Sequence, residues 1–207
     1  MIVTFDANFI LMLFDPRARV PKRVGKPAIK NAKERIELLV EELSKKKAKL
    51  ILPTPALAEF FLLASDSYER YLQEIKKRSA FEVIGFDDSA CIELVDISIT
   101  LGKPKKIKPE DTWAKLKYDR QIVAIAKVNR ASVIYSTDDG LRSLAVQVGM
   151  KALDLEDLPE PPPKQTELDL VSTPKSKNSK SPSPDATGVT SPTTNPGATP
   201  AAPTENI

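Results

Sequence analysis

One stretch of the chain passes from a strand pattern to a helix pattern and so indicates the fold class. Residues 50–65 read LILPTPALAEFFLLAS. The apolar run at its start is typical of a short buried strand. Thr54 suits the cap of the following helix, and Pro55 suits its first turn, where no N–H is needed. The rest of this helix is apolar on nearly every side, which predicts burial nearly all round.

The same alternation of short strands and helices extends in both directions, through residues 1–158. Strands are predicted at 2–5, 50–52, 81–86, 132–135 and from 152 onward. Helices are predicted at 29–47, 54–65, 67–79, 88–102, 112–130 and 140–147. This order is typical of a three-layer α/β fold, with a central, mostly parallel sheet flanked by helices. In such folds, ligands bind beyond the carboxyl ends of the strands.

The composition changes near residue 158. Residues 159–207 are rich in Pro, Ser, Thr, Asn and Ala and contain no aromatic residue. Such a segment cannot bury enough apolar surface to offset its conformational entropy. We therefore predict a folded domain at 1–158, followed by a disordered tail at 159–207.

Two simple features bear on location. No run of roughly 18 uncharged apolar residues occurs, so no membrane span is expected. The N-terminus lacks the basic flank and cleavage site of a secretory signal. We therefore expect a cytoplasmic protein. The single cysteine, Cys91, lies in an apolar helical pattern, and we expect it to pack in the core.

The absence of histidine restricts the chemistry. The sequence contains no histidine, which excludes histidine triads, histidine zinc sites and histidine acid–base nucleases. Carboxylates, Lys, Arg, Tyr, hydroxyl groups or a bound ion remain. The net charge of +3 is a weak sign of polyanion binding, and the basic residues gather in two runs that fit either solvated loops or a phosphate-binding surface. The runs comprise Arg17, Arg19, Lys22, Arg23, Lys26 and Lys30, and Lys103, Lys105, Lys106 and Lys108.

Two acidic positions follow predicted strands. Asp6 comes directly after the strand at 2–5, and Asp138, with Asp139 beside it, follows the strand at 132–135. If these strands are parallel neighbours, the acids meet at the edge of the sheet where ligands bind. Each acid alone is equally typical of the N-cap of a following helix.

Two more acidic positions lie within predicted helices. Glu59 lies in the apolar helix at 54–65, with no Lys or Arg within one helical turn. Asp119 lies three residues before Ile122, at the edge of a core-facing stripe. A buried charge needs a partner. A shared ligand would supply one, and a salt bridge to a distant Arg or partial exposure would also explain either residue.

A shared cation would explain all four acids together. Carboxylates a few ångströms apart raise each other's pKa, so a cluster stays ionised at neutral pH when a cation lies among them. Oxygen ligands favour Mg²⁺ or Mn²⁺. Such an ion suits phosphodiester hydrolysis, because it can activate a water molecule and neutralise a phosphate oxygen.

Four segments, one around each acid, carry a family resemblance. They are residues 2–11, 53–60, 118–126 and 133–141, and the last two contain D-x-x-I-x-A-x-A and a strand end similar to T-x-D-x-x-(F/L). Their order and spacing resemble the PIN-domain nucleases, which include the VapC-type toxins of bacterial toxin–antitoxin pairs. The resemblance implies a Rossmann-like sheet, Mg²⁺ or Mn²⁺, and endonucleolytic cleavage of RNA. The acidic set that it implies is Asp6, Glu59, Asp119 and Asp138.

The sequence departs from the family pattern at several places. Ala7 and Asn8 stand where the family usually has Ser or Thr behind the first Asp, and we expect Asn8 to supply an equivalent oxygen. Ser136 replaces the usual Thr. Asp139 is a second candidate for the fourth ligand, but Asp138 fits better because it lies two residues after the hydroxyl. The residues predicted to bind RNA are Arg17, Arg19, Lys22, Arg23, Lys105 and Lys106.

Three functions are compatible with this sequence. The first is a metal-dependent endoribonuclease that is the toxin of a toxin–antitoxin pair, with an antitoxin as partner and a homodimer as its assembly. The second is a PIN nuclease that processes RNA without an antitoxin. The third is a catalytically inactive domain that binds RNA or protein. Cleavage assays and metal binding separate them.

Overall fold

The computed structural model describes residues 1–21, 29–102 and 113–162. All of them lie in the first of two compact units, Met1–Lys164. The second unit, Gln165–Ile207, lies outside the described residues, and so does the predicted disordered tail from residue 163 onward.

A parallel sheet forms the centre of the first unit. Five strands of the described ranges pair in the order β3-β2-β1-β4-β5, and every neighbouring pair is parallel. Thr4 in the central strand lies opposite both Ile51 and Ile134, so the three middle strands end at the same edge. The strands are β1 (Ile2–Phe5), β2 (Lys49–Pro53), β3 (Phe81–Ile84), β4 (Val133–Tyr135) and β5 (Lys151–Leu153).

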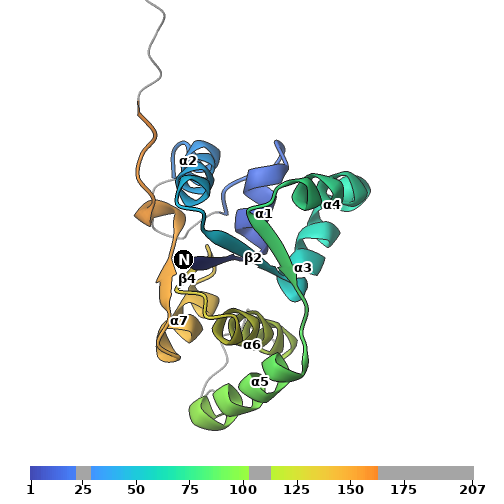
Figure 1. Cartoon of the computed structure of the whole chain (residues 1–207), viewed down its shortest axis with the longest axis vertical. Helices are drawn as coiled ribbons and strands as arrows, with labels where there is room; N and C mark the ends of the chain where they lie inside the picture. Colours follow the sequence, from blue (N-terminus) through green and yellow to red (C-terminus); the bar gives the residue numbers. More distant parts are fainter. Residues whose placement is uncertain (22–28, 103–112, 163–207) are drawn as a thin grey trace, which may run out of the picture. The chain divides into compact units, whose positions relative to one another are not determined.

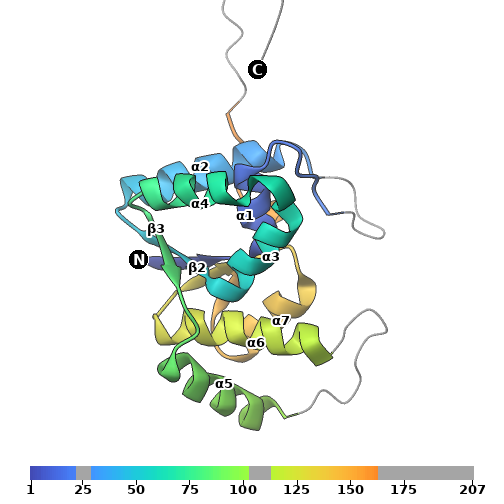
Figure 2. The same ribbon diagram turned by 90° about the vertical axis from the view of Figure 1, so that its right-hand side faces the viewer.

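Helices cover both faces of this sheet and make the three predicted layers. In Figures 1 and 2, α1, α2 and α4 lie on one side of the sheet and α5, α6 and α7 on the other. Helix α5 lies outside α6 and packs against it (Figure 2). The helices are α1 (Ala7–Phe14), α2 (Ala32–Lys45), α3 (Thr54–Ala64), α4 (Tyr68–Lys77), α5 (Asp88–Leu101), α6 (Trp113–Val128) and α7 (Asp139–Gln147), with short 3₁₀ turns at Ser65–Ser67 and Leu155–Asp157.

Short side chains begin several of these helices, because the first backbone N–H groups of a helix need acceptors. Asp87 accepts a hydrogen bond from the Ala90 N–H at the start of α5. The predicted cap at Thr54 is wrong: α3 starts with Thr54 as its first helical residue, after Pro53, and no side chain caps it.

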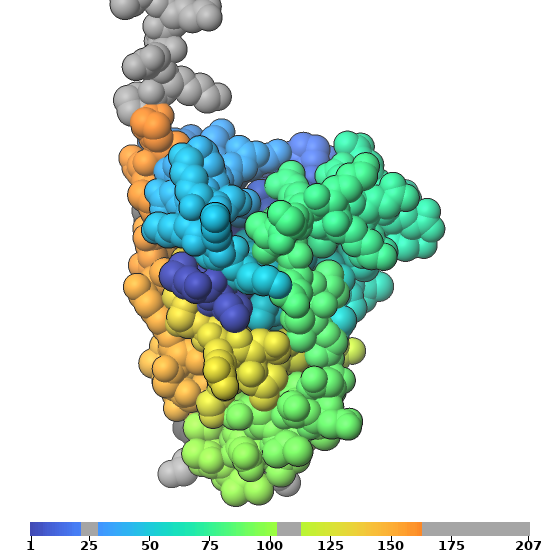
Figure 3. Space-filling view, in the orientation of Figure 1, coloured from blue at the N-terminus to red at the C-terminus, as the bar shows by residue number. Residues whose placement is uncertain are grey.

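The core is aromatic beside the central strand. The rings of Phe5 and Phe9 lie 5.4 Å apart, and Tyr135 packs edge-on against Phe5 at 5.5 Å. These three rings join β1, α1 and β4 on one side of the sheet. In the space-filling view of Figure 3, the start of β1 reaches the surface between α2 and the segment that joins α6 to β4.

The prediction that α3 is buried on nearly every side is wrong. Phe60 is fully buried, but Leu62 is 83% exposed and Leu63 is 53% exposed. A helix that is apolar on every side does not reveal which side later elements will cover. Cys91 is a second correction, since it is exposed on α5, a helix in which only Ala90 and Ile97 are buried.

No helix in the three described ranges combines the length and the hydrophobicity needed to cross a membrane.

Two substitutions in α3 test this division of the helix. Phe60→Ala should lower the free energy of unfolding by about 3–5 kcal/mol, because it removes a fully buried ring and leaves a cavity. Leu62→Ala should change it by less than about 0.5 kcal/mol in the monomer, because the side chain is largely in water there. Urea denaturation followed by circular dichroism measures both. A large loss for Leu62→Ala would mean that this face is covered.

Candidate active site

The four predicted acids line one pocket at the carboxyl edge of the sheet. The pocket has a volume of about 390 Å³. Asp6 comes from the end of β1, Glu59 from α3, Asp119 from α6 and Asp138 from the turn between β4 and α7. The other lining residues are Ala7, Asn8, Pro55, Ala58, Leu62, Lys115, Tyr118, Ile122 and Leu141.

Asp6 is the buried acid of the pocket, and both of its carboxylate oxygens are held. One oxygen accepts a hydrogen bond of 2.9 Å from the Phe9 N–H and so caps α1. The other accepts a short hydrogen bond from the Ser136 hydroxyl. The pKa of Asp6 is raised to about 6, chiefly by burial and also by the charges of Glu59 and Asp138, while these two hydrogen bonds lower it.

Ser136 joins two of the acids. It is fully buried just after β4, where its hydroxyl donates to Asp6 and accepts the Asp138 N–H at 2.9 Å. Since one oxygen atom makes both contacts, the end of β1 and the start of α7 are fixed relative to each other. Ser136, which stands in place of the usual Thr of the family pattern, therefore lies between two acids.

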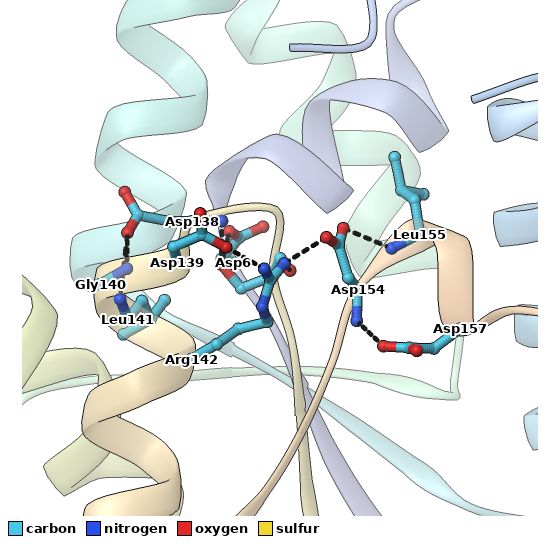
Figure 4. Close-up of polar contacts among 10 residues, drawn as sticks. Asp6, Asp138, Asp139, Gly140, Leu141, Arg142, Asp154, Leu155 and Asp157 are labelled. Carbon is cyan, nitrogen blue, oxygen red and sulfur yellow. Dashed lines mark hydrogen bonds and ion pairs between the residues drawn. The ribbon is translucent and has the colours of Figure 1, made fainter. Parts of the chain in front are cut away.

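Asp138 divides its two oxygens between a helix and a lysine. Its Oδ1 accepts the Gly140 and Leu141 N–H groups, at 2.7 and 3.0 Å, and so caps α7 (Figure 4). Its Oδ2 lies 2.8 Å from Nζ of Lys115. Burial raises the pKa of Asp138, but the Lys115 ammonium and the two N–H groups outweigh burial and leave the pKa below its usual value.

Glu59 and Asp119 complete the acidic lining. Glu59 lies on the exposed side of α3, so the prediction that it is buried is wrong. Even so, desolvation in the pocket and the charge of Asp138 raise its pKa, while Lys115 lowers it. Asp119 is half-buried, as expected for the edge of the core-facing stripe of α6.

Asp139 takes a different direction from its neighbour. It lies outside the pocket lining and pairs with Arg142. In Figure 4, the Arg142 guanidinium lies between Asp139 and Asp154. Nη1 of Arg142 donates to the Ser136 carbonyl at 2.9 Å and lies 2.5 Å from the buried Asp154 carboxylate. Through the hydrogen bond to the Ser136 carbonyl, this ion-pair network also holds the Ser136 backbone in place.

The sequence prediction missed Lys115, Arg142 and Asp154. Asp139 and Arg142 are three residues apart in α7, so helical spacing alone could have suggested their pairing. Nothing local in the sequence links Arg142 to Asp154, because that contact depends on how α7 packs beside the segment after β5.

The described members of the predicted RNA-binding set do not line the pocket. Arg17 pairs with Asp15 at 3.0 Å, and hydrogen bonds from Arg17 keep the pKa of Asp15 below its usual value. Arg19 is exposed, and neither arginine lines the pocket. The other predicted members, Lys22, Arg23, Lys105 and Lys106, lie outside the described residues. Asn8 does line the pocket.

The chemistry of the lining fits a hard divalent cation. Its acids offer only oxygen ligands, and mutual repulsion contributes to the raised pKa of Asp6 and of Glu59. The positions of the acids fit such an ion less well than their chemistry does. Within the described ranges, no group of three or more Asp, Glu, His or Cys is placed to hold a metal ion. An ammonium group, that of Lys115, lies against one of the acids instead.

Comparisons with known proteins give similarity to solved structures only. No protein-family model matches the sequence. No curated protein matches it either. The chain is similar to a chain in the DNA-bound VapBC2 structure from Rickettsia felis, with a TM-score of 0.49 and 14% identity over 74% of this chain and 98% of that one.

Two further structures are similar in the same way. One is VapBC-1 from nontypeable Haemophilus influenzae, with a TM-score of 0.45 and 17% identity over 75% of this chain and 99% of that one. The other is DNA-bound VapBC from Salmonella typhimurium, with a TM-score of 0.46 and 20% identity over 75% of this chain and 98% of that one.

The raised pKa of Asp6 predicts a pH dependence of stability. The folded value of about 6 exceeds the model-peptide value of 3.8, so the folded state binds more protons between these two pH values. Stability should therefore fall as pH rises through this window, by at most about 3 kcal/mol from this group. Asp6→Asn should remove this contribution. Denaturant titrations at pH 4.5 and 7, without divalent cations, give the difference between the two proteins, and equal pH profiles would contradict the prediction.

Proposed function

We propose that this chain is a PIN-type endoribonuclease that cleaves RNA phosphodiester bonds with Mg²⁺ or Mn²⁺ held at the acidic pocket. One observation carries the proposal: four acids from four distant segments of the chain line a single pocket at the carboxyl edge of a parallel sheet. If these acids served only in separate surface ion pairs, nothing would require them to share one pocket.

The ion would be held by the carboxylates of Asp6, Asp119 and Asp138, with Glu59 beside them. When bound, it would supply an activated water and neutralise charge on the phosphate. The Ser136 hydroxyl holds the Asp6 carboxylate in place, so this ligand would already be ordered before a metal ion binds.

The remaining lining residues suit the same chemistry. The raised pKa of Glu59 lies closer to neutral pH than that of an ordinary glutamate, which suits a group that takes and returns a proton. Ile122 and Leu141, which are both buried, give the pocket apolar walls. Such walls exclude water and strengthen the electrostatic interactions between the site and a phosphate.

We further propose that the nuclease acts in the cytoplasm as the toxin of a toxin–antitoxin pair. This rests on the likeness of the four acidic segments to VapC-type toxins, and it implies an antitoxin as partner. The exposed Leu62 and Leu63 offer an apolar surface for a homodimer. Expression should arrest growth, and Asp119→Asn should relieve the arrest. Growth that is unaffected by the active chain would favour an RNA-processing role.

Two adjacent aspartates provide a matched test of the nuclease activity. Purified protein with Mn²⁺ should cleave structured RNA, and EDTA should abolish cleavage. Asp138→Asn should lower the rate on the order of 100-fold, because an electrostatic contact to the reacting centre is lost. Asparagine is also a good N-cap, so α7 should persist in this variant.

Asp139→Asn is the control, since Asp139 pairs with Arg142 and lies outside the pocket lining. Its cleavage rate should stay within a few-fold of that of the unchanged protein. Asp6→Asn should be as inactive as Asp138→Asn. Cleavage that survives both EDTA and Asp6→Asn would argue against the proposal, and the absence of cleavage under all conditions would favour a binding module.

A further inference from the structure

Lys115 brings a positive charge into the acidic pocket. Its side chain lines the pocket together with the four acids, and its Nζ lies 2.8 Å from Oδ2 of Asp138. The side chains of Lys115 and Asp138 are 39% and 27% exposed, so the ion pair is only partly shielded from water.

The charge of Lys115 acts on more than one acid. It helps to hold the pKa of Asp138 below its usual value, against burial. It also opposes the rise in the pKa of Glu59 that burial and Asp138 cause. Since Glu59 belongs to α3 and Asp138 to the start of α7, one ammonium group compensates negative charge from two different elements.

The position of Lys115 on α6 explains why it faces the pocket. Lys115 lies four residues before Asp119, so both project from the same face of the helix. Lys117 is only two residues away but lies on another face. It lines a separate hollow between α5 and α6, together with Leu94 and Trp113. The helix thus carries two lysines of the same chemistry, one inside the acidic pocket and one outside it.

The two oxygens of Asp138 are not equivalent. Oδ1 is engaged by the Gly140 and Leu141 N–H groups at the start of α7. Oδ2 is therefore the oxygen that can turn to a ligand, and it is the oxygen that Lys115 contacts. Mg²⁺ binds a carboxylate oxygen at roughly 2.0–2.1 Å and would repel an ammonium group on the same atom.

We propose that Lys115 is the counter-cation of this pocket, and that a divalent metal ion must displace its ammonium group from Asp138 in order to bind. The inference rests on the proposed metal-dependent function. It also accounts for the open spacing of the acids, because an ammonium group held by one of them stands in the place of a shared ion. The long, flexible lysine side chain allows this withdrawal without a movement of α6. Lys115 therefore sets the metal affinity of the site.

Metal binding by the full chain tests the inference directly. Isothermal titration with Mn²⁺ at fixed pH and ionic strength should show that Lys115→Met binds about three- to fivefold more tightly than the unchanged protein, the scale of a partly exposed ion pair. Lys117→Met removes the same charge from another face of α6 and should leave the Kd unchanged within about twofold. Lys115→Arg keeps the charge and should not tighten binding.

A second measurement needs no substitution. If Mn²⁺ displaces the ammonium group, acetylation of Lys115 by an amine-reactive reagent should become faster when Mn²⁺ is added, while acetylation of Lys117 should not. Mass spectrometry of the digested protein measures both lysines in one sample. This readout covers the case in which Lys115→Met fails to fold.

The outcomes separate the inference from the function on which it rests. Equal or weaker Mn²⁺ binding by Lys115→Met, with an unchanged acetylation rate, would overturn the role of Lys115 and leave the metal-dependent nuclease intact. If neither the unchanged protein nor Lys115→Met binds Mn²⁺ at millimolar concentrations, the metal-dependent function fails, and the inference fails with it.

Discussion

The buried Asp6 carboxylate is the constraint around which this site is built. One of its oxygens caps α1 and the other accepts the Ser136 hydroxyl, so a single side chain joins β1, α1 and β4. A carboxylate that is removed from water loses hydration, and two hydrogen bonds do not restore all of it. The pKa of about 6 expresses this deficit. The fold therefore keeps an acid at the sheet edge where a cation would stabilise its ionised form. The negative charges of the other pocket acids would increase this stabilisation.

Much of this arrangement could be predicted from the sequence, because it depends on local patterns and on one rule of topology. Short apolar strands that alternate with helices predict a parallel sheet, and a parallel sheet brings the ends of β1 and β4 together. The convergence of Asp6 and Asp138 needs one more condition, that β1 and β4 are neighbours, and the strand order of the structure supplies it. The exposure of α3 could not be predicted in this way. Its apolar residues leave the helix free to bury any side, and neighbours distant in the sequence decide that Phe60 is covered and Leu62 is not.

Contacts between elements account for the rest of what the sequence did not reveal. Lys115 meets Asp138 because α6 and α7 lie side by side, and Arg142 meets Asp154 because α7 borders the segment after β5. No spacing along the chain encodes either pair. The difference between Asp138 and Asp139 is of another kind. The first is the N-cap and the second is the first helical residue, so one step along the backbone turns their side chains to different sides of α7.

Capping and ligand binding are usually treated as competing explanations for an aspartate that follows a strand, but a carboxylate has two oxygens and can serve both. In Asp138, Oδ1 receives the helix N–H groups while Oδ2 faces Lys115 in the pocket. The cap fixes the side chain, so little rotamer freedom remains to be lost when a ligand binds. The same hydrogen bonds stabilise the ionised form of the acid. In the proposed metal site, the start of α7 would thus supply a charged oxygen that is already oriented, and only the lysine would have to move.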